Sequence, residues 1–244
     1  MNHRTFILVP GAWMGQWIWA GIEQRLRARG QVVHAMTLPG LESPPLLRYQ
    51  VSLETHVRHV VDFMKVSNLR EVVLVGHGYS GLVVGQAAQR LPDRVCHTVF
   101  LEAYVPEEGR SLLELADLDV EAVQRQINDN QGLWPVPSER VLAYETQLTT
   151  ADHRFLKQRL VGHPGRTVTD PVRLQGPLAD LSATYVGRQA PAVIRDWLTL
   201  PEPERNWHHI PLAGGHWPML STPDQLTSAL LSVGCKTAVR ALQT

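Results

Sequence analysis

Hydrophobic and polar positions follow two different periods along most of this chain. Short apolar runs rich in β-branched residues predict buried strands at residues 6–9, 32–37, 72–75, 98–101, 184–186 and 208–211. Longer stretches with apolar residues three or four positions apart predict helices at residues 19–29, 53–66, 81–90, 192–200 and 223–233. Because strands and helices alternate, the pattern predicts a doubly wound, mostly parallel sheet with helices on both faces.

The pattern changes between residues 106 and 181. Three polar, helix-prone stretches at 111–128, 138–148 and 151–160 are broken by Trp134-Pro-Val-Pro137 and Gly162-His-Pro-Gly165. The change predicts a helical cap, residues 106–181, inserted into an α/β core made of residues 1–105 and 182–244. The total of 244 residues fits a single large domain with such an insertion.

Composition narrows the classes of partner. The 23 basic and 23 acidic residues cancel, and no segment carries a run of like charge. This balance favours a small-molecule substrate over nucleic acid or a membrane surface, and it leaves a homodimer open. The first apolar stretch is too short for a signal peptide, and no apolar run is as long as a membrane span. We therefore expect a soluble, cytoplasmic protein.

The cysteine and histidine patterns give little indication of a disulfide framework or a metal site. Cys96 and Cys235 lie far apart and form neither a disulfide framework nor a C-x-x-C metal pattern. His56 and His59 are one helical turn apart, but no third ligand accompanies them, and we expect this pair to face solvent. No metal and no cofactor are expected.

The segment after the strand at 72–75 carries the main functional signal. Gly76-His-Gly-Tyr-Ser80 has the form of a nucleophile elbow, G-x-S-x-G, a sharp turn that holds one side chain above the end of a strand. Gly78 occupies the central position, where a serine would supply the nucleophilic oxygen. Ser80 stands where the motif has its second glycine, a packing position, so we do not expect it to be catalytic.

A dinucleotide-binding interpretation competes with the elbow. Gly76-His-Gly-Tyr-Ser-Gly81 also reads as G-x-G-x-x-G between a strand and a helix, with Glu102 about twenty residues further on. That fingerprint normally follows the first strand of a nucleotide-binding unit, whereas two strands precede it here. The cofactor interpretation is therefore the less favoured one.

Other segments could complete a catalytic site around the elbow. Gly11-Ala-Trp-Met-Gly15 follows the first strand and could aim the N–H of Ala12 or Trp13, together with that of Tyr79, at a developing oxyanion, although an ordinary strand-to-helix turn is the alternative. His216 lies in a glycine-containing loop before the last helix and is the best-placed general base. The candidate pocket walls are apolar or aromatic, although several of the tryptophans could instead belong to the core: Trp13, Trp17, Tyr104, Trp134 and Met219.

With these parts, the chain resembles the α/β-hydrolases of the salicylate esterase and hydroxynitrile lyase branch, especially small bacterial members. The resemblance spans nearly the whole length, and no single motif carries it. Its marks are Leu8-Val-Pro-Gly-Ala12 with Trp17 and Trp19, Leu38-Pro-Gly40, Val73-Leu-Val-Gly-His77, Phe100-Leu-Glu-Ala-Tyr-Val-Pro106, Gly162-His-Pro164 and Gly215-His-Trp-Pro-Met219.

The resemblance implies a Ser–acid–His triad, from which this chain departs twice. Gly78 replaces the serine, and Gly187-Arg-Gln-Ala-Pro191, where the acid would follow its strand, contains no carboxylate. Glu102, at the end of the strand after the elbow helix, is the candidate to orient His216. The alternative for Glu102 is a buried carboxylate that accepts hydrogen bonds from nearby loop N–H groups.

Three functions remain open from the sequence. The first is an enzyme acting on a small apolar or aromatic carbonyl compound through a His216–Glu102 acid/base dyad and an oxyanion hole, in cyclisation, elimination or lyase chemistry without an acyl-enzyme. The second is a serine esterase, for carboxylic esters or lactones, whose nucleophile has been replaced by Gly78. The third is a non-catalytic protein that keeps only the binding pocket.

Overall fold

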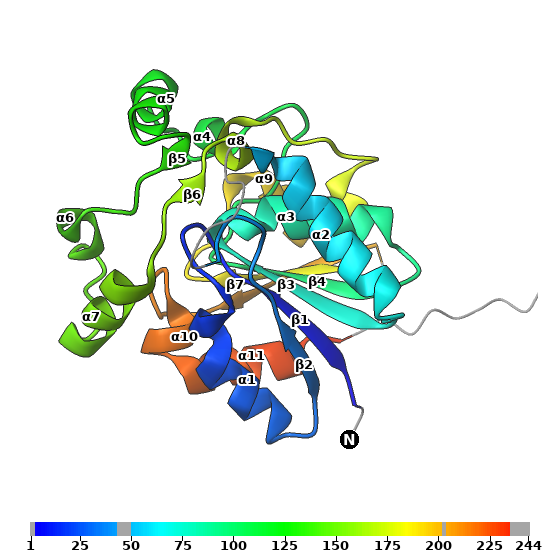
Figure 1. Ribbon diagram of the computed structural model, residues 1–244. Helices are drawn as coiled ribbons and strands as arrows, with labels where there is room; N and C mark the ends of the chain where they lie inside the picture. The colour runs from blue at the N-terminus through cyan, green and yellow to red at the C-terminus, as the bar shows by residue number, and fades with distance from the viewer. Residues whose placement is uncertain (1–2, 43–49, 202–203, 235–244) are drawn as a thin grey trace, which may run out of the picture.

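A parallel sheet forms the centre of the computed structural model, which describes residues 3–42, 50–201 and 204–234 (Figure 1). Its six strands lie in the order β2-β1-β3-β4-β7-β8, and every neighbouring pair is parallel. The predicted fold class is confirmed. The strands are β1 (Thr5–Val9), β2 (Val32–Ala35), β3 (Val72–His77), β4 (Val95–Leu101), β7 (Ala183–Gly187) and β8 (Trp207–Pro211).

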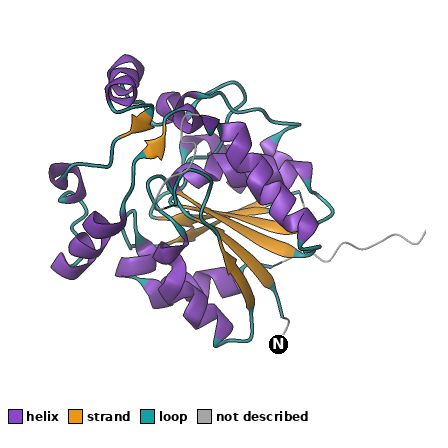
Figure 2. Ribbon diagram, viewed as in Figure 1, coloured by secondary structure: helices purple, strands orange, loops and turns teal. Residues whose placement is uncertain are grey.

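Helices cover both faces of this sheet (Figure 2). One face carries α1 (Ala20–Arg27), α10 (Pro218–Ser221) and α11 (Pro223–Ser232), and the other carries α2 (Leu53–Val66), α3 (Gly81–Arg90) and α9 (Ala192–Leu198). Short 3-10 helices precede α1, α3 and β7: η1 (Gln16–Trp19), η3 (Gly78–Ser80) and η4 (Leu178–Asp180).

Burial on both faces explains why the strands read as continuous apolar runs. In β1, Phe6 and Leu8 join the core beneath α1 and α11, whereas Ile7 and Val9 join the core beneath α2 and α3. Successive side chains of a strand point to opposite faces, so a strand covered on both sides needs apolar residues at every position.

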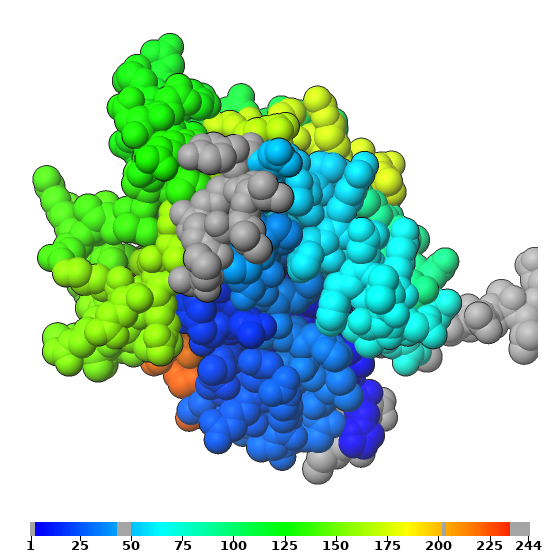
Figure 3. Space-filling model, in the orientation of Figure 1, coloured from blue at the N-terminus to red at the C-terminus, as the bar shows by residue number. Residues whose placement is uncertain are grey.

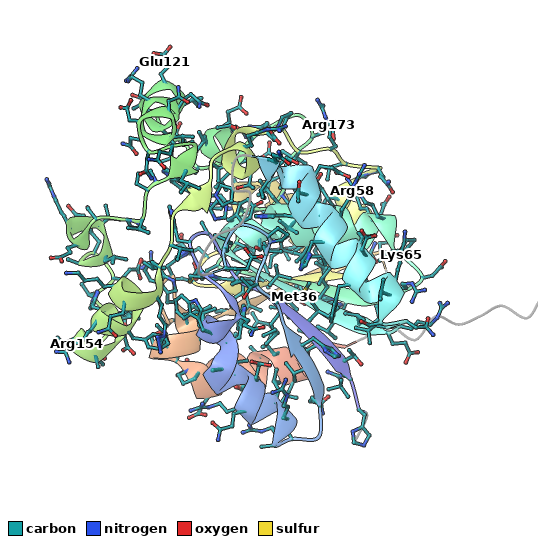
Figure 4. The ribbon with its side chains drawn as sticks, in the orientation of Figure 1. Met36, Arg58, Lys65, Glu121, Arg154 and Arg173 are labelled. Atoms are coloured by element: carbon teal, nitrogen blue, oxygen red, sulfur yellow. The ribbon has the colours of Figure 1, made fainter. Side chains whose placement is uncertain are left out.

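Helix α2 has the boundaries that its sequence predicts. The Ser52 side chain accepts a hydrogen bond from the Thr55 N–H, and the Thr55 side chain returns one to the Ser52 N–H, which closes a capping box. Arg58 and Lys65 project from the outward face of the helix (Figure 4).

The segment between β4 and β7 forms a separate layer at the carboxyl ends of the strands (Figure 1). It contains α4 (Leu112–Leu115), α5 (Val120–Asp129), α6 (Glu139–Leu142), α7 (Thr150–Arg159) and α8 (Arg166–Thr169), together with an antiparallel pair, β5 (Leu133–Trp134) and β6 (His163–Pro164). Glu121 and Arg154 of this layer are directed away from the sheet (Figure 4), and the layer forms the left side of the molecule in the space-filling view (Figure 3).

Two expectations for this segment are corrected. The helix expected at 111–128 is interrupted by Asp117, whose φ of +52° is left-handed, and Asp119 then caps α5. The helix expected at 138–148 ends at Leu142, where the N–H groups of Tyr144 and Glu145 turn back to the carbonyls of Val141 and Leu142. The two breaks lie side by side, where Trp134 of β5 pairs with His163 of β6.

No helix within the described residues is long and apolar enough to cross a membrane. Residues 235–244, assigned to the core from the sequence, lie outside the described residues, and Cys235 is among them.

Candidate active site

The carboxyl ends of the parallel strands bring the candidate residues to one edge of the sheet. Gly78 follows β3, Glu102 follows β4, and the loop containing Ala12 and Trp13 follows β1. His216 lies between β8 and α10. Ligand sites of open parallel sheets form at this edge, because the loops after the strands meet there.

Position 78 has the geometry of a nucleophile elbow. Gly78 has a φ of +53°, in the left-handed region that glycine adopts without strain. A Cβ atom built on Gly78 would lie 3.3 Å from both Cε1 and Nε2 of His216 and 3.8 Å from the Gly11 Cα. A side chain at this position would therefore begin directly beside the imidazole.

Ser80 is committed to a structural role. Its buried Oγ donates a hydrogen bond to the Pro10 carbonyl at 2.5 Å, which ties the turn before α3 to the loop after β1. Its hydroxyl hydrogen is therefore engaged, and the side chain has no exposed surface.

The start of α3 is closed by the segment after β4. A Cβ at Gly81 would lie 2.1 Å from the Tyr104 carbonyl oxygen, and the Tyr104 N–H donates to the Gly78 carbonyl at 3.1 Å. A dinucleotide needs a helix N-terminus that is open to the pyrophosphate. This packing provides no such opening, and Gly81 serves close packing of the helix.

His216 is held through its backbone on two sides. Its N–H donates to Glu145 Oε2 at 3.0 Å, and its carbonyl accepts from His77 Nε2 at 2.6 Å. Burial lowers the pKa of His216, and the nearby Glu145 carboxylate partly offsets this effect. The ring is therefore biased towards its neutral form, which can accept a proton.

His77 acts as a neutral support for His216. Burial is the main cause that holds the pKa of His77 well below its ordinary value, and the neighbouring His216 acts in the same direction. The two rings lie 4.7 Å apart between centroids. Because Nε2 donates to the His216 carbonyl, the hydrogen is on Nε2, and Nδ1 is a buried acceptor without a partner among the described residues.

Glu102 lies in the same cavity as His216 but does not bond to its ring. No hydrogen bond joins the two side chains in the part of the chain that the structure describes; Glu102 Oε1 accepts from the Arg188 N–H at 2.7 Å. This bond matches the alternative considered from the sequence, in which Glu102 accepts hydrogen bonds from nearby loop N–H groups. Burial raises the pKa of Glu102, and the bond from Arg188 partly opposes that effect. Its φ of +42° is strained for a non-glycine residue.

Trp13 joins the loop after β1 to the cap. Its φ is +64°, its N–H donates to His163 Nδ1 at 3.2 Å, and its carbonyl accepts from the Val161 N–H at 3.0 Å. Its indole N–H donates to the Trp134 carbonyl at 3.3 Å, and the two tryptophan rings lie 4.3 Å apart. The N–H of Trp13 is thus occupied, whereas that of Ala12 makes no hydrogen bond within the described residues.

A cavity of about 350 Å³ opens beside His216. Two tyrosines and several aliphatic residues form most of its wall, and among the described residues the side chains that line it include two carboxylates and no lysine or arginine. The lining residues are Glu102, Ala103, Tyr104, Val105, Glu107, Leu115, Tyr185, Pro191, Val193 and His216.

The other expected wall residues lie elsewhere in the structure. Met219 is buried in the core beneath α1 and α11, and Trp17 packs on Phe155 of α7 with ring centroids 5.4 Å apart. Trp134 packs against Trp13, where the cap contacts the loop after β1. Of the five candidate wall residues, Tyr104 alone is among the described residues that line this cavity.

A buried polar cluster lies behind the elbow. His56 Nε2 donates to the Pro39 carbonyl, so His56 Nδ1 accepts from the Tyr79 hydroxyl, both at 2.9 Å. The expectation that His56 and His59 both face solvent is wrong for His56, which is fully buried with these partners, while His59 is exposed. Burial lowers the pKa of His56 to about 4.

Sequence reasoning missed three residues that contact the site: His77, Glu145 and Tyr185. His77 could have been noticed, because it occupies the elbow motif beside Gly78. Nothing in the local sequence marks Glu145 or Tyr185, since the cap and a sheet strand reach the site only through the tertiary fold.

The sequence and fold are similar to those of known proteins. Residues 6–229 match the alpha/beta hydrolase family, and the chain belongs to that family. It is 28% identical to the carbendazim hydrolyzing esterase of Nocardioides sp. (strain SG-4G), over 94% of this chain and 99% of that protein. It is 27% identical to esterase PIR7B of Oryza sativa subsp. japonica, over 96% and 97% of the two chains.

Solved structures show the same fold. Tomato methylketone synthase I, complexed with 2-tridecanone, matches with a TM-score of 0.73 at 21% identity, over 96% of this chain and 98% of that one. The chain is therefore an α/β-hydrolase-fold protein related to esterases.

Proposed function

We propose that this protein is an enzyme that uses His216 as an acid/base on a small carbonyl compound, without an acyl-enzyme. The observation that carries the proposal is the pairing of Gly78 with His216: the imidazole lies 3.3 Å from the point where a nucleophile would begin, and position 78 supplies no oxygen. The groups that remain are a base and backbone N–H donors. Together they suit proton abstraction next to a carbonyl.

The proposed step moves one proton. His216 Nε2 takes a proton from the carbon next to the carbonyl, and the electron pair of that C–H bond forms an enolate. Because the Trp13 N–H already donates to His163, the N–H groups left to hold the enolate oxygen are those of Ala12 and Tyr79. Return of the proton to carbon gives exchange only. Where the enolate electron pair expels a leaving group that takes the proton, the result is elimination or lyase chemistry, and where the enolate carbon attacks an electrophile of the same molecule and the imidazolium protonates the resulting anion, the result is cyclisation.

We propose that Glu102 contributes part of the stabilisation of the imidazolium through the shared cavity. It has no bond to the ring, so its proposed effect is that of a nearby negative charge. Protonation of His216 during the step would lower the pKa of Glu102 towards its ordinary value and favour the carboxylate.

The cavity favours an uncharged substrate. Glu102 and Glu107 line it, and Arg110, the partner of Glu107 at 3.0 Å, is not among the lining residues. A carboxylate ligand would meet these acidic groups without a lining cation, which raises its free energy of binding.

Deuterium exchange tests the proposal without knowledge of the natural substrate. A panel of small alkyl and aryl methyl ketones in D₂O, followed by NMR, should exchange their α-protons faster with the protein than without it. His216→Ala should remove the catalysed exchange, a loss of about 10²–10⁴-fold, because general-base catalysis has this size. Glu102→Gln should lose part of it, and the double variant should resemble His216→Ala alone.

Matched controls separate the other functions. His59→Ala removes an exposed histidine of α2 and should leave exchange intact. Ketone binding with no exchange by the unmodified protein would support a binding protein instead. Exchange that persists in His216→Ala would overturn the proposed role of the imidazole.

A serine esterase that has lost its nucleophile is the second candidate function. The elbow geometry at Gly78 and the esterase relatives favour it. Under this alternative the unmodified protein catalyses no exchange, and its activity returns only when position 78 carries a hydroxyl.

A further inference from the structure

The carboxylate that contacts the His216 segment comes from the cap. Glu145 lies in the turn between α6 and α7, and its Oε2 accepts the His216 N–H at 3.0 Å. Gly215, with a φ of +68°, leaves space for this approach, because a Cβ at that position would lie 2.8 Å from the same oxygen. A glycine at 215 is therefore required for the contact.

Among the described residues, the titratable groups around His216 include Tyr104 and Tyr185 of the cavity wall and three groups with distinct roles. His77, from the end of β3, is neutral and donates to the His216 carbonyl. Glu102, after β4, is bonded to the Arg188 N–H. Glu145, from the cap, bonds to the backbone of His216 and favours the protonated ring electrostatically.

The usual source of an orienting acid is absent from this chain. Residues 188–191, which follow β7, contain no carboxylate, and Glu102 accepts its hydrogen bond from the Arg188 N–H. We propose that Glu145 is a positioning residue that substitutes for this acid: it fixes the loop carrying His216 and supplies the negative charge that stabilises the imidazolium. The proposal rests on the proposed function for its effect on rate, but the electrostatic contact exists independently of any reaction.

The cap holds Glu145 firmly in this position. The Glu145 N–H donates to the Leu142 carbonyl at 3.0 Å, and the Glu145 carbonyl accepts from the Leu148 N–H at 3.1 Å. Leu142 and Leu148 are buried in the core that also contains Trp217, the residue after His216. The acid and the histidine are thus anchored to one packed cluster, which limits how far they can separate.

Glu145→Gln is the most informative change. The glutamine oxygen can still accept the His216 N–H, so the variant removes the charge and keeps the hydrogen bond. NMR titration of ¹³C-labelled histidines, with the His216 signal assigned from its loss in His216→Gln, measures the ring directly. We expect the titration midpoint of His216 to fall by about half a pH unit or more, because an opposite charge that favoured protonation has been removed.

The exchange reaction supplies the second measurement. Glu145→Gln should lower kcat by about 10-fold with KM nearly unchanged, because the lost charge acts on the imidazolium and does not touch the substrate. Glu145→Ala removes both the charge and the hydrogen bond and should lower kcat further. Glu139→Gln is the matched control, because Glu139 is an exposed carboxylate of α6 that pairs with Lys157, and it should change neither measurement.

The outcomes separate this proposal from the proposed function. A downward shift of the His216 titration in Glu145→Gln, with no ketone exchange by the unmodified protein, supports the role of Glu145 and refutes the acid/base reaction. An unchanged His216 titration in folded Glu145→Gln, accompanied by a shift in Glu102→Gln, overturns the role of Glu145 and assigns the charge to Glu102. An equal loss of kcat in Glu139→Gln would also overturn it.

Discussion

Gly78→Ser is expected to turn this protein into an esterase. The new Cβ would lie 3.3 Å from His216 Nε2 and Cε1, and the hydroxyl is one bond further, so a rotamer can bring Oγ within hydrogen-bonding reach of Nε2. A 3.3 Å approach is tight, and the imidazole must move by a few tenths of an ångström to accept the side chain.

The cost of the substitution is moderate. A non-glycine residue at a φ of +53° stores about 1–3 kcal/mol of strain. In a domain of this size each kcal/mol lowers Tm by about 2–4 °C, so we expect a drop of roughly 2–12 °C. A total stability of about 5–15 kcal/mol leaves the variant folded.

The expected gain in esterase activity is large enough to measure despite this loss of stability. Hydrolysis of p-nitrophenyl acetate and a panel of small aryl and alkyl esters should rise at least about 100-fold over the unmodified protein, equivalent to about 2.7 kcal/mol of barrier. Gly78→Ala is the matched control, because it carries the same backbone strain and no oxygen, and it should gain nothing. Adding His216→Ala to Gly78→Ser should remove the gain.

One result would refute the reasoning. If Gly78→Ser folds with the same Tm loss as Gly78→Ala and remains inactive on the whole ester panel, the site lacks a working base or oxyanion hole. The alternative of a serine esterase with a replaced nucleophile would then fail as well.

Two further predictions follow from the buried polar groups. A serine-directed fluorophosphonate should leave the unmodified protein unlabelled by intact-mass spectrometry, because the Ser80 hydroxyl is bonded to the Pro10 carbonyl; labelling at Ser80 would contradict that assignment. The free energy of unfolding in urea should decrease as the pH falls from 6.5 towards 4, because the pKa of His56 is lowered to about 4 and the unfolded chain binds a proton that the folded one excludes. The contribution of His56 reaches about 3 kcal/mol, and His56→Gln should reduce the slope; an identical slope in that variant would show that His56 is not the cause.

Much of the fold is readable from local sequence because the strands are buried on both faces. Continuous apolar runs such as Val72–Val75 have few alternatives to a central parallel strand, and Ser52 marks the start of α2 through its capping box. The cap is less readable, since its short helices are polar and their ends depend on single residues such as Asp117.

The candidate site is readable only where strand ends define it. Gly78, Glu102 and His216 follow strands or precede a helix, so their common edge can be predicted. The direction of each side chain at that edge cannot be predicted from local sequence, because it depends on segments that are far apart in the chain. Glu102, for example, accepts a hydrogen bond from the Arg188 N–H. The contribution of Glu145 depends on how the cap folds back, which no local pattern encodes.

The attachment of Trp13 has a consequence for protein engineering. Its N–H, carbonyl and indole N–H are all bonded to cap residues, so the loop after β1 and the cap share one set of contacts. A chimera that exchanges the cap at the 106–181 junctions alone would replace the His163 ring that accepts the Trp13 N–H and the Trp134 ring that packs against the Trp13 indole. A cap transplant from a relative should therefore carry that relative's residue at position 13, so that the recombination unit comprises two separate stretches of sequence.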